Sequence, residues 1–191
     1  MKFKDFSNNF FSYHASLLRE VDLENVDKFI NILLDARRRD AHVFLIGNGG
    51  SAATASHFAE DVSFFKKSDN FKPIKAISLT DSVPAISALG NDYGYENIFV
   101  DQLRVLLRKG DIVVAISGSG NSLNLVKAIN YANKKGAITF GLLGFDGGKM
   151  KKICKHNILI KTAKGEYEIV ESIHLLLTQL IRGYLKSKFS V

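Results

Sequence analysis

Residues 117–122, Ser-Gly-Ser-Gly-Asn-Ser, form a serine- and glycine-rich loop between two segments of clear secondary-structure pattern, and this combination restricts the fold strongly. The residues before it, 112–116, are apolar and mostly β-branched, which predicts a buried strand. The residues after it, 123–135, carry apolar side chains at helical spacing, which predicts an amphipathic helix. Parallel sheets covered by helices are built from such strand–loop–helix units, so we expect an α/β fold.

The same order of elements recurs along the chain. Further strands are predicted at residues 42–46, 73–79, 137–143 and 157–160, the second of them buried. Helices are predicted at two places between residues 3 and 38, from Ser51 or Ala52 to about Phe65, from residue 81 or 82 to 89, and at 96–107 and 168–186. Residues 90–94 are predicted to form a loop, and Gly147 and Gly148 to open a short helix.

These elements define the expected architecture. We expect a three-layer α/β/α sandwich around a five-stranded parallel sheet, preceded by N-terminal helices. Residues 1–40 are expected to form a helical segment that packs in an oligomer, because its phenylalanine stripe is too apolar for a free helix in water. Residues 41–191 are expected to complete a single structural domain.

The serine loop, residues 117–122, offers what a phosphate group needs. Ser117, Ser119 and Ser122 supply hydroxyl donors, and Gly118 allows close approach of the backbone. The start of the following helix adds free N–H groups and the positive end of its dipole. The alternative is a tight turn whose serines cap the helix, but a cap needs one serine and this loop has three.

A second loop follows the first predicted strand. It contains Asn48, Gly49, Gly50 and Ser51, which can surround the hydroxyl groups of a sugar. Because ligands of such sheets bind beyond the carboxyl ends of the strands, the two loops can share one site. The loop lacks the third glycine of the dinucleotide-binding fingerprint, so no nucleotide cofactor is expected.

His57 and Asp61 stand four residues apart on the helix after this second loop, so they share one helix face. An imidazole beside a carboxylate suits a metal ion or a proton transfer. The spacing alone is equally compatible with a surface ion pair.

Composition excludes several other classes of protein. The chain of 191 residues has a net charge of +7, but its basic clusters lack helix-turn-helix or zinc-finger spacing, so nucleic acid is not an expected partner. No apolar run reaches the ~18 residues that a membrane span requires. The N-terminus lacks the apolar core of a signal peptide, and Cys154 is the single cysteine, expected to be a small packing residue. No membrane partner and a cytoplasmic location are therefore expected.

Four motifs in order resemble a known family. They are Gly47-Asn-Gly-Gly-Ser-Ala-Ala53 with His57-Phe-Ala59, Asn91-Asp-Tyr-Gly94, the serine loop, and Gly144-Phe-Asp-Gly-Gly-Lys149. The serine loop resembles the Ser-x-Ser-Gly-x-Ser signature of the sugar isomerase (SIS) domain, a flavodoxin-like fold that binds phosphosugars. Taken together, the motifs resemble the phosphoheptose isomerases from about residue 44 to 180. The resemblance implies conversion of sedoheptulose 7-phosphate to glycero-manno-heptose 7-phosphate through an enediolate, feeding surface-polysaccharide synthesis.

The resemblance also implies roles for residues before the last helix. The family positions matched by His57 and Asp61 carry a zinc-ligating histidine and a catalytic glutamate, so Asp61 is one methylene shorter than the family residue. Asn91 and Asp92 match residues that contact the substrate. The family forms homotetramers with active sites between subunits, which implies a homo-oligomer here.

The last predicted helix departs from the family pattern. When it is aligned on His174, Glu171 stands where the family has Gln. Gln179 stands where the family has a second zinc-ligating histidine, which is also its proposed general acid or base.

Two hypotheses follow from these departures. In the first, the site is rearranged: Asp61 and Glu171 transfer the proton, and His57, Asp61, Glu171 and Gln179 offer a nitrogen and oxygens to a divalent metal such as zinc. His174 is a further candidate. In the second, chemistry is lost, and the chain is a non-catalytic phosphosugar sensor or a protein-binding scaffold like a replication-initiator-binding relative. The first is favoured because both sugar-facing loops are retained.

Overall fold

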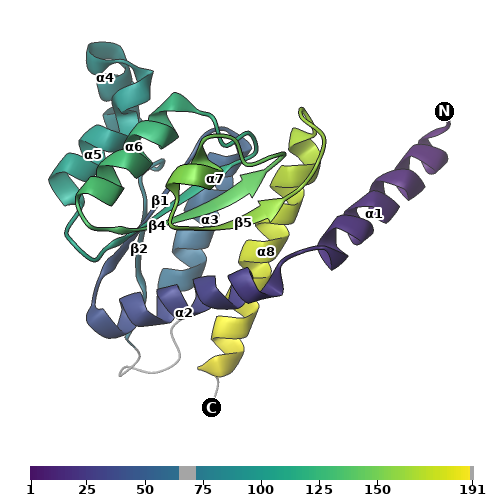
Figure 1. Cartoon of the computed structure of the whole chain (residues 1–191), viewed down its shortest axis with the longest axis horizontal. Helices are drawn as coiled ribbons and strands as arrows, with labels where there is room; N and C mark the ends of the chain where they lie inside the picture. Colours follow the sequence, from purple (N-terminus) through teal and green to yellow (C-terminus); the bar gives the residue numbers. More distant parts are fainter. Residues whose placement is uncertain (65–71, 190–191) are drawn as a thin grey trace.

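The computed structural model describes residues 1–64 and 72–189 of the chain. At its centre lies a five-stranded, all-parallel sheet with strand order β2-β1-β3-β4-β5 (Figure 1). The strands are β1 (His42–Gly47), β2 (Lys75–Ser78), β3 (Ile112–Ser117), β4 (Ile138–Gly144) and β5 (His156–Ile160). Helices cover both faces of the sheet, so the expected three-layer α/β/α architecture is confirmed.

Strand β3 shows why helices pack on both sides. Every residue of β3 is buried, and alternate side chains point to opposite faces of the sheet. Ile112, Val114 and Ile116 join the cluster formed with α2 (Leu23–Arg39), α3 (Gly50–Ser63) and α8 (Tyr167–Lys188). Val113 and Ala115 join the opposite cluster, formed with α5 (Ile98–Leu106), α6 (Leu123–Lys134) and α7 (Met150–Ile153).

The two predicted N-terminal helices are present. The second, α2, is capped by Asp22, whose carboxylate accepts a hydrogen bond from the Asn25 N–H at 3.1 Å. In the core, Phe29 of α2 stacks on Phe140 with ring centroids 4.1 Å apart. The first, α1 (Phe3–Arg19), extends away from the sheet (Figure 1). Several of its phenylalanines are exposed. No helix in the described ranges is long and apolar enough to cross a membrane.

Helix α1 is tied to the start of α8 by two side-chain contacts. The Tyr13 hydroxyl donates a hydrogen bond to Glu166 Oε2 at 2.9 Å. His14 Nε2 lies 2.6 Å from the hydroxyl oxygen of Ser172. These contacts join the protruding N-terminal helix to the turns of α8 that face the candidate site.

Strand β2 differs from the sequence-based expectation. The buried strand predicted at residues 73–79 is a four-residue strand in which only Ser78 is buried. The reason is its position at the edge of the sheet, where neighbouring elements cover it less completely. The helix predicted to reach Phe65 ends at Ser63, and Phe65 itself lies outside the described residues.

The prediction that residues 90–94 form a loop is wrong. Helix α4 (Val83–Tyr93) is capped by Ser82, one of the two positions expected to start it, and it continues until Gly94, whose φ of 89° ends it. Asn and Asp are only slightly worse helix formers than most residues, so a helix already started runs on to the glycine. The helix predicted at 96–107 is likewise divided into a 3₁₀ turn, η1 (Tyr95–Asn97), and α5.

Two buried side chains, Cys154 and His174, have strongly shifted pKa values. Cys154 is buried, and burial raises the pKa of its thiol to about 12, as expected for a packing residue. His174 on α8 is fully buried, and desolvation lowers the pKa of its imidazole to about 4, which the backbone of Leu143 opposes only in part. His174 is therefore a neutral core side chain at physiological pH.

Replacing His174 by leucine should remove part of the acid sensitivity of folding. The unfolded chain binds a proton at His174 below pH 6.5 and the folded chain does not, so stability is complete above pH 6.5 and falls toward pH 4. The His174-dependent part of this loss is on the order of 3 kcal/mol. Urea unfolding of wild type and His174→Leu at several pH values between 7 and 4 gives the free energy of unfolding as a function of pH. The wild-type value should fall more steeply toward pH 4, and equal slopes would contradict a neutral buried imidazole.

Candidate active site

The serine loop connects β3 to α6, and its own side chains shape it. The hydroxyl of Ser117 accepts a hydrogen bond from the Gly120 N–H at 3.0 Å, and that of Ser119 accepts one from the Asn121 N–H at 3.3 Å. Ser122 occupies the N-cap position of α6, but its side chain makes no capping hydrogen bond. Ser122 therefore does not cap α6 with its side chain, and the hydroxyls of Ser117 and Ser119 hydrogen-bond within the loop itself.

The segment 144–150 packs against this loop through backbone contacts. A Cβ on Gly120 would lie 2.0 Å from the carbonyl oxygen of Gly147, so the two backbones touch where only glycine fits. Met150 N–H donates to the Gly120 carbonyl at 3.0 Å, and Lys149 N–H donates to Asn121 Oδ1 at 3.1 Å. Residues 144–149, which the sequence singles out as a motif, thus hold the serine loop in shape.

The loop between β1 and α3 faces the serine loop across a small cavity of about 100 Å³. The predicted residues that line it are Asn48, Ser51, Ser117, Gly118, Ser119 and Ser122. Tyr167 and Glu171 of α8 close its side. The N-termini of α3 and α6 both open toward this space, an arrangement suited to an anion.

Asn48 is held in place by side chains that the sequence analysis does not identify. Its amide exchanges hydrogen bonds with the amide of Asn124, at 3.1 and 2.9 Å, and its oxygen also accepts one from the Tyr95 hydroxyl at 3.0 Å. Asn124 is 2% exposed, and its oxygen also accepts the Leu125 N–H at 2.9 Å. The sequence signal that could have identified Asn124 is its position, because it is a polar residue next to Leu125, an apolar position of the predicted helix.

Glu171 is placed by a contact between α8 and the start of α3. A Cβ on Gly50 would lie 2.2 Å from Glu171 Oε2, so the glycine makes room for this carboxylate. Glu171 also lines a second cavity of about 380 Å³, together with His57 and Glu168. Glu171 therefore lines both the loop cavity and the larger cavity that contains His57 of α3. Burial, and secondarily the charge of Glu168, raises the pKa of its carboxyl.

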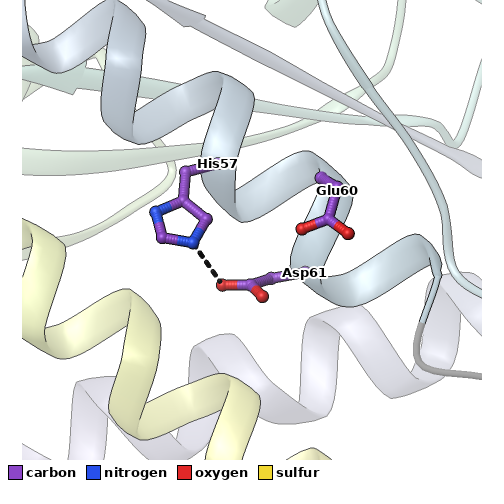
Figure 2. A group of neighbouring side chains, drawn as sticks. All are labelled: His57, Glu60 and Asp61. Carbon is purple, nitrogen blue, oxygen red and sulfur yellow. Dashed lines mark ion pairs between the residues drawn. The ribbon is translucent and has the colours of Figure 1, made fainter.

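Asp61 is the centre of the cluster on α3. Its side chain is 4% exposed, and His57 Nε2 lies 3.4 Å from Asp61 Oδ2 (Figure 2). Gln179 Nε2 of α8 donates to the same oxygen at 2.6 Å and lies 3.5 Å from His57 Nε2. Arg182 Nε of α8 lies 2.5 Å from the other oxygen, Oδ1.

This cluster has donor atoms that suit a divalent metal. One ligand atom each from His57, Glu60 and Asp61 lies within 4.8 Å of the others (Figure 2). Imidazole nitrogen and carboxylate oxygen are common zinc ligands, so the donor set fits such an ion. Glu60 was not singled out from the sequence, although its spacing of three residues from His57 places it on the same side of the helix.

Of the remaining predicted residues, Asn91, Asp92 and His174 lie outside both cavities that Glu171 lines. Asn91 and Asp92 sit in the last turn of α4, where the Asn91 amide donates to Asp92 Oδ1 at 2.7 Å, and neither lines the two cavities beside Glu171. His174 is buried in the core and also lines neither cavity. Gly50 lines the larger cavity, and Gly49 forms the N-cap of α3 with a φ of 54°.

Comparison with known proteins agrees with this arrangement. The model of the SIS domain matches residues 9–144. The chain is 35% identical over 167 residues to the phosphoheptose isomerase of Aliarcobacter butzleri, which covers 87% of each chain. It is 39% identical over 150 residues to that of Campylobacter concisus, covering 78% of this chain and 76% of the relative. The solved structure of phosphoheptose isomerase from Neisseria gonorrhoeae has a TM-score of 0.86 at 29% identity and covers 97% of this chain and 100% of that one.

The sheet order, the serine loop and the match over most of the chain define a SIS domain. The match ends at residue 144, so α8, with Glu171 and Gln179, lies beyond it. With relatives above 30% identity along most of its length, the chain belongs to the phosphoheptose isomerase family and is an isomerase.

The contact between Gly120 and Gly147 can be tested with a matched pair of substitutions. Gly120 and Gly165 both have positive φ, 63° and 101°, but no atom of residues 1–64 and 72–189 lies within 4 Å of a Cβ on Gly165. Both alanine variants bear backbone strain of about 1–3 kcal/mol. Gly120→Ala must also displace Gly147, so urea unfolding should show a further loss of about 1–3 kcal/mol. Equal losses would contradict a tight contact.

Proposed function

We propose that the protein interconverts sedoheptulose 7-phosphate and glycero-manno-heptose 7-phosphate, in the synthesis of heptose for surface polysaccharide. The observation that carries this proposal is the position of Glu171 between the loop cavity and the cavity lined by His57. A phosphosugar has an anionic end and a reacting end, and the two cavities match these two requirements. The named relatives support the sugar class, because they are phosphoheptose isomerases.

The loop cavity is proposed to hold the phosphate. Ser119 and Ser122 offer hydroxyl groups there, and the uncapped start of α6 offers backbone N–H groups. Asn48 and Ser51 would then contact the sugar hydroxyls next to the phosphate. The bonds from Asn124 and Tyr95 hold the Asn48 amide in one orientation before the substrate arrives, which reduces the entropy lost on binding.

Glu171 is proposed to transfer the proton. Aldose–ketose isomerisation removes a proton from C1 of the ketose, forms an enediolate and returns a proton to C2, while O1 becomes the carbonyl oxygen and O2 a hydroxyl. A carboxylate with a raised pKa is a better base for a carbon acid than an ordinary one. Asp61 remains the second proton-transfer candidate, and its side chain contacts both His57 and Gln179.

A divalent ion such as Zn²⁺ is proposed to bind at the cluster on α3. His57, Glu60 and Asp61 would hold it, with Gln179 beside them. Glu171, the remaining member of the ligand set expected from sequence, lines the same cavity as His57. When bound, such an ion stabilises negative charge on the oxygens of an enediolate.

We infer that the protein assembles as a homotetramer. Its support is the apolar surface on α1, where Phe3, Phe6 and Phe11 are exposed, and on α8, where Leu176 and Leu180 are exposed. Because α1 contacts α8 through Tyr13 and His14, such an assembly would enclose the side of the site formed by α8.

The isomerisation is tested directly in deuterated water. The purified protein should convert the ketose phosphate to the aldose phosphate and place deuterium at C2 of the product. Glu171→Gln and Asp61→Asn should each lower kcat by about 10²–10⁴-fold, the usual contribution of an acid or base. Thermal stabilisation by the phosphosugar without conversion would instead indicate a sensor. Full turnover in both variants would remove the assigned roles.

The pH dependence tests which carboxylate is the base. Since Glu171 must be ionised to accept a proton and its pKa is raised, kcat/KM should fall on the acid side at a higher pH than for an ordinary glutamate. Glu168→Gln removes the like charge and should move this acid limb to lower pH, without abolishing the shift, because burial is the larger cause. Glu24→Gln, at an exposed position of α2, is the matched control. An acid limb identical in all three proteins would contradict Glu171 as the base.

A further inference from the structure

The ion pair between Arg182 and Asp61 is unusual because it lies inside the candidate metal cluster. Asp61 is 4% exposed, and both of its oxygens are engaged, Oδ1 by Arg182 and Oδ2 by Gln179 and His57. Three donor groups thus converge on one buried carboxylate. Such a group is electrostatically satisfied without any further cation.

Arg182 Nε is itself buried and makes no hydrogen bond of regular geometry with the described part of the chain. Its contact with Asp61 at 2.5 Å is therefore a close ion pair directed into the cluster. The Arg182 side chain is 37% exposed overall, so the rest of it reaches solvent while the Nε side faces Asp61. The charge is fixed, because an arginine does not lose its proton in proteins.

If His57 and Asp61 bound a divalent ion, only the carboxylate group of Asp61 would separate that ion from the Arg182 guanidinium. Metal–oxygen bonds at such sites are about 2.0–2.2 Å long, so the ion and the guanidinium would be close neighbours of like charge. They would also compete for the negative charge of Asp61. The same guanidinium that neutralises Asp61 therefore opposes the binding of a metal.

We propose that Arg182 is a positioning residue that balances the charge of Asp61 and thereby lowers the affinity of the His57–Asp61 centre for divalent metal ions. Arg182 supplies the positive charge that a tightly bound ion would otherwise supply at Asp61, and it keeps this carboxylate directed toward His57 and Gln179. The inference rests on the proposed function of this cluster, but it concerns binding of a metal and not turnover.

The test is the affinity of the purified full chain for Zn²⁺, measured by competition with a chromophoric chelator in the absence of substrate. Arg182→Met removes the charge while keeping a long side chain, and we expect it to bind Zn²⁺ about tenfold more tightly than wild type. Arg182→Lys keeps the charge and should stay close to wild type. Adding His57→Ala to Arg182→Met should abolish the gain, which locates the ion at this centre.

Arg182→Gln provides a second route if Arg182→Met does not fold, because its amide can still donate to Asp61 without a charge. A gain below threefold in the uncharged variant, or an equal gain in Arg182→Lys, overturns the proposal. Because no substrate is present, the result is separate from the isomerase assay. Loss of isomerisation alone would contradict the proposed function and leave this measurement unaffected.

Discussion

The packing of α8 across α3 on one face of the sheet determines the chemistry available to this protein. It brings Glu171 against Gly50 at one end, and Gln179 and Arg182 against Asp61 further along. Buried apolar residues of both helices, including Phe58 and Ile173, join the same core cluster, so hydrophobic burial fixes the relative position of the polar groups. The proposed reacting end of the site is therefore formed by helix packing, and the proposed phosphate end is formed by loops.

The proposed phosphate end depends on backbone contacts of a different kind. The serine loop touches the segment 144–150 where Gly120 meets Gly147. Its shape is set by hydrogen bonds that the Gly120 carbonyl accepts from Met150 N–H and that Asn121 Oδ1 accepts from Lys149 N–H. Serine hydroxyls near a helix start are useful to an anion only when the loop holds them there, which is how a rigid scaffold gives a loop its function. The two ends of the site thus have separate structural supports, and Glu171 belongs to both cavities.

Local patterns predict most of the fold. The apolar run at 112–116 and the helical spacing after it correspond to β3 and α6, because burial on both faces of a sheet leaves a strong local signal. Strand β2 and residues 90–94 were misjudged, since exposure at an edge and the length of a helix depend on neighbours that propensity does not describe. Asn124 and Arg182 were not identified, because their partners become apparent only when distant segments meet, as Asn48 and Asn124 do across 76 positions. Glu60 was also missed, although its partners His57 and Asp61 lie on the same helix.

The three donors around Asp61 also constrain how this chain can change over time. A longer carboxylate at position 61 would have to find new room beside both Gln179 and Arg182, while loss of Arg182 alone would leave a buried negative charge without its counter-ion. Substitutions at positions 61, 179 and 182 are therefore not independent of one another. The effect of a different acid at position 61 therefore depends on which side chains stand at positions 179 and 182.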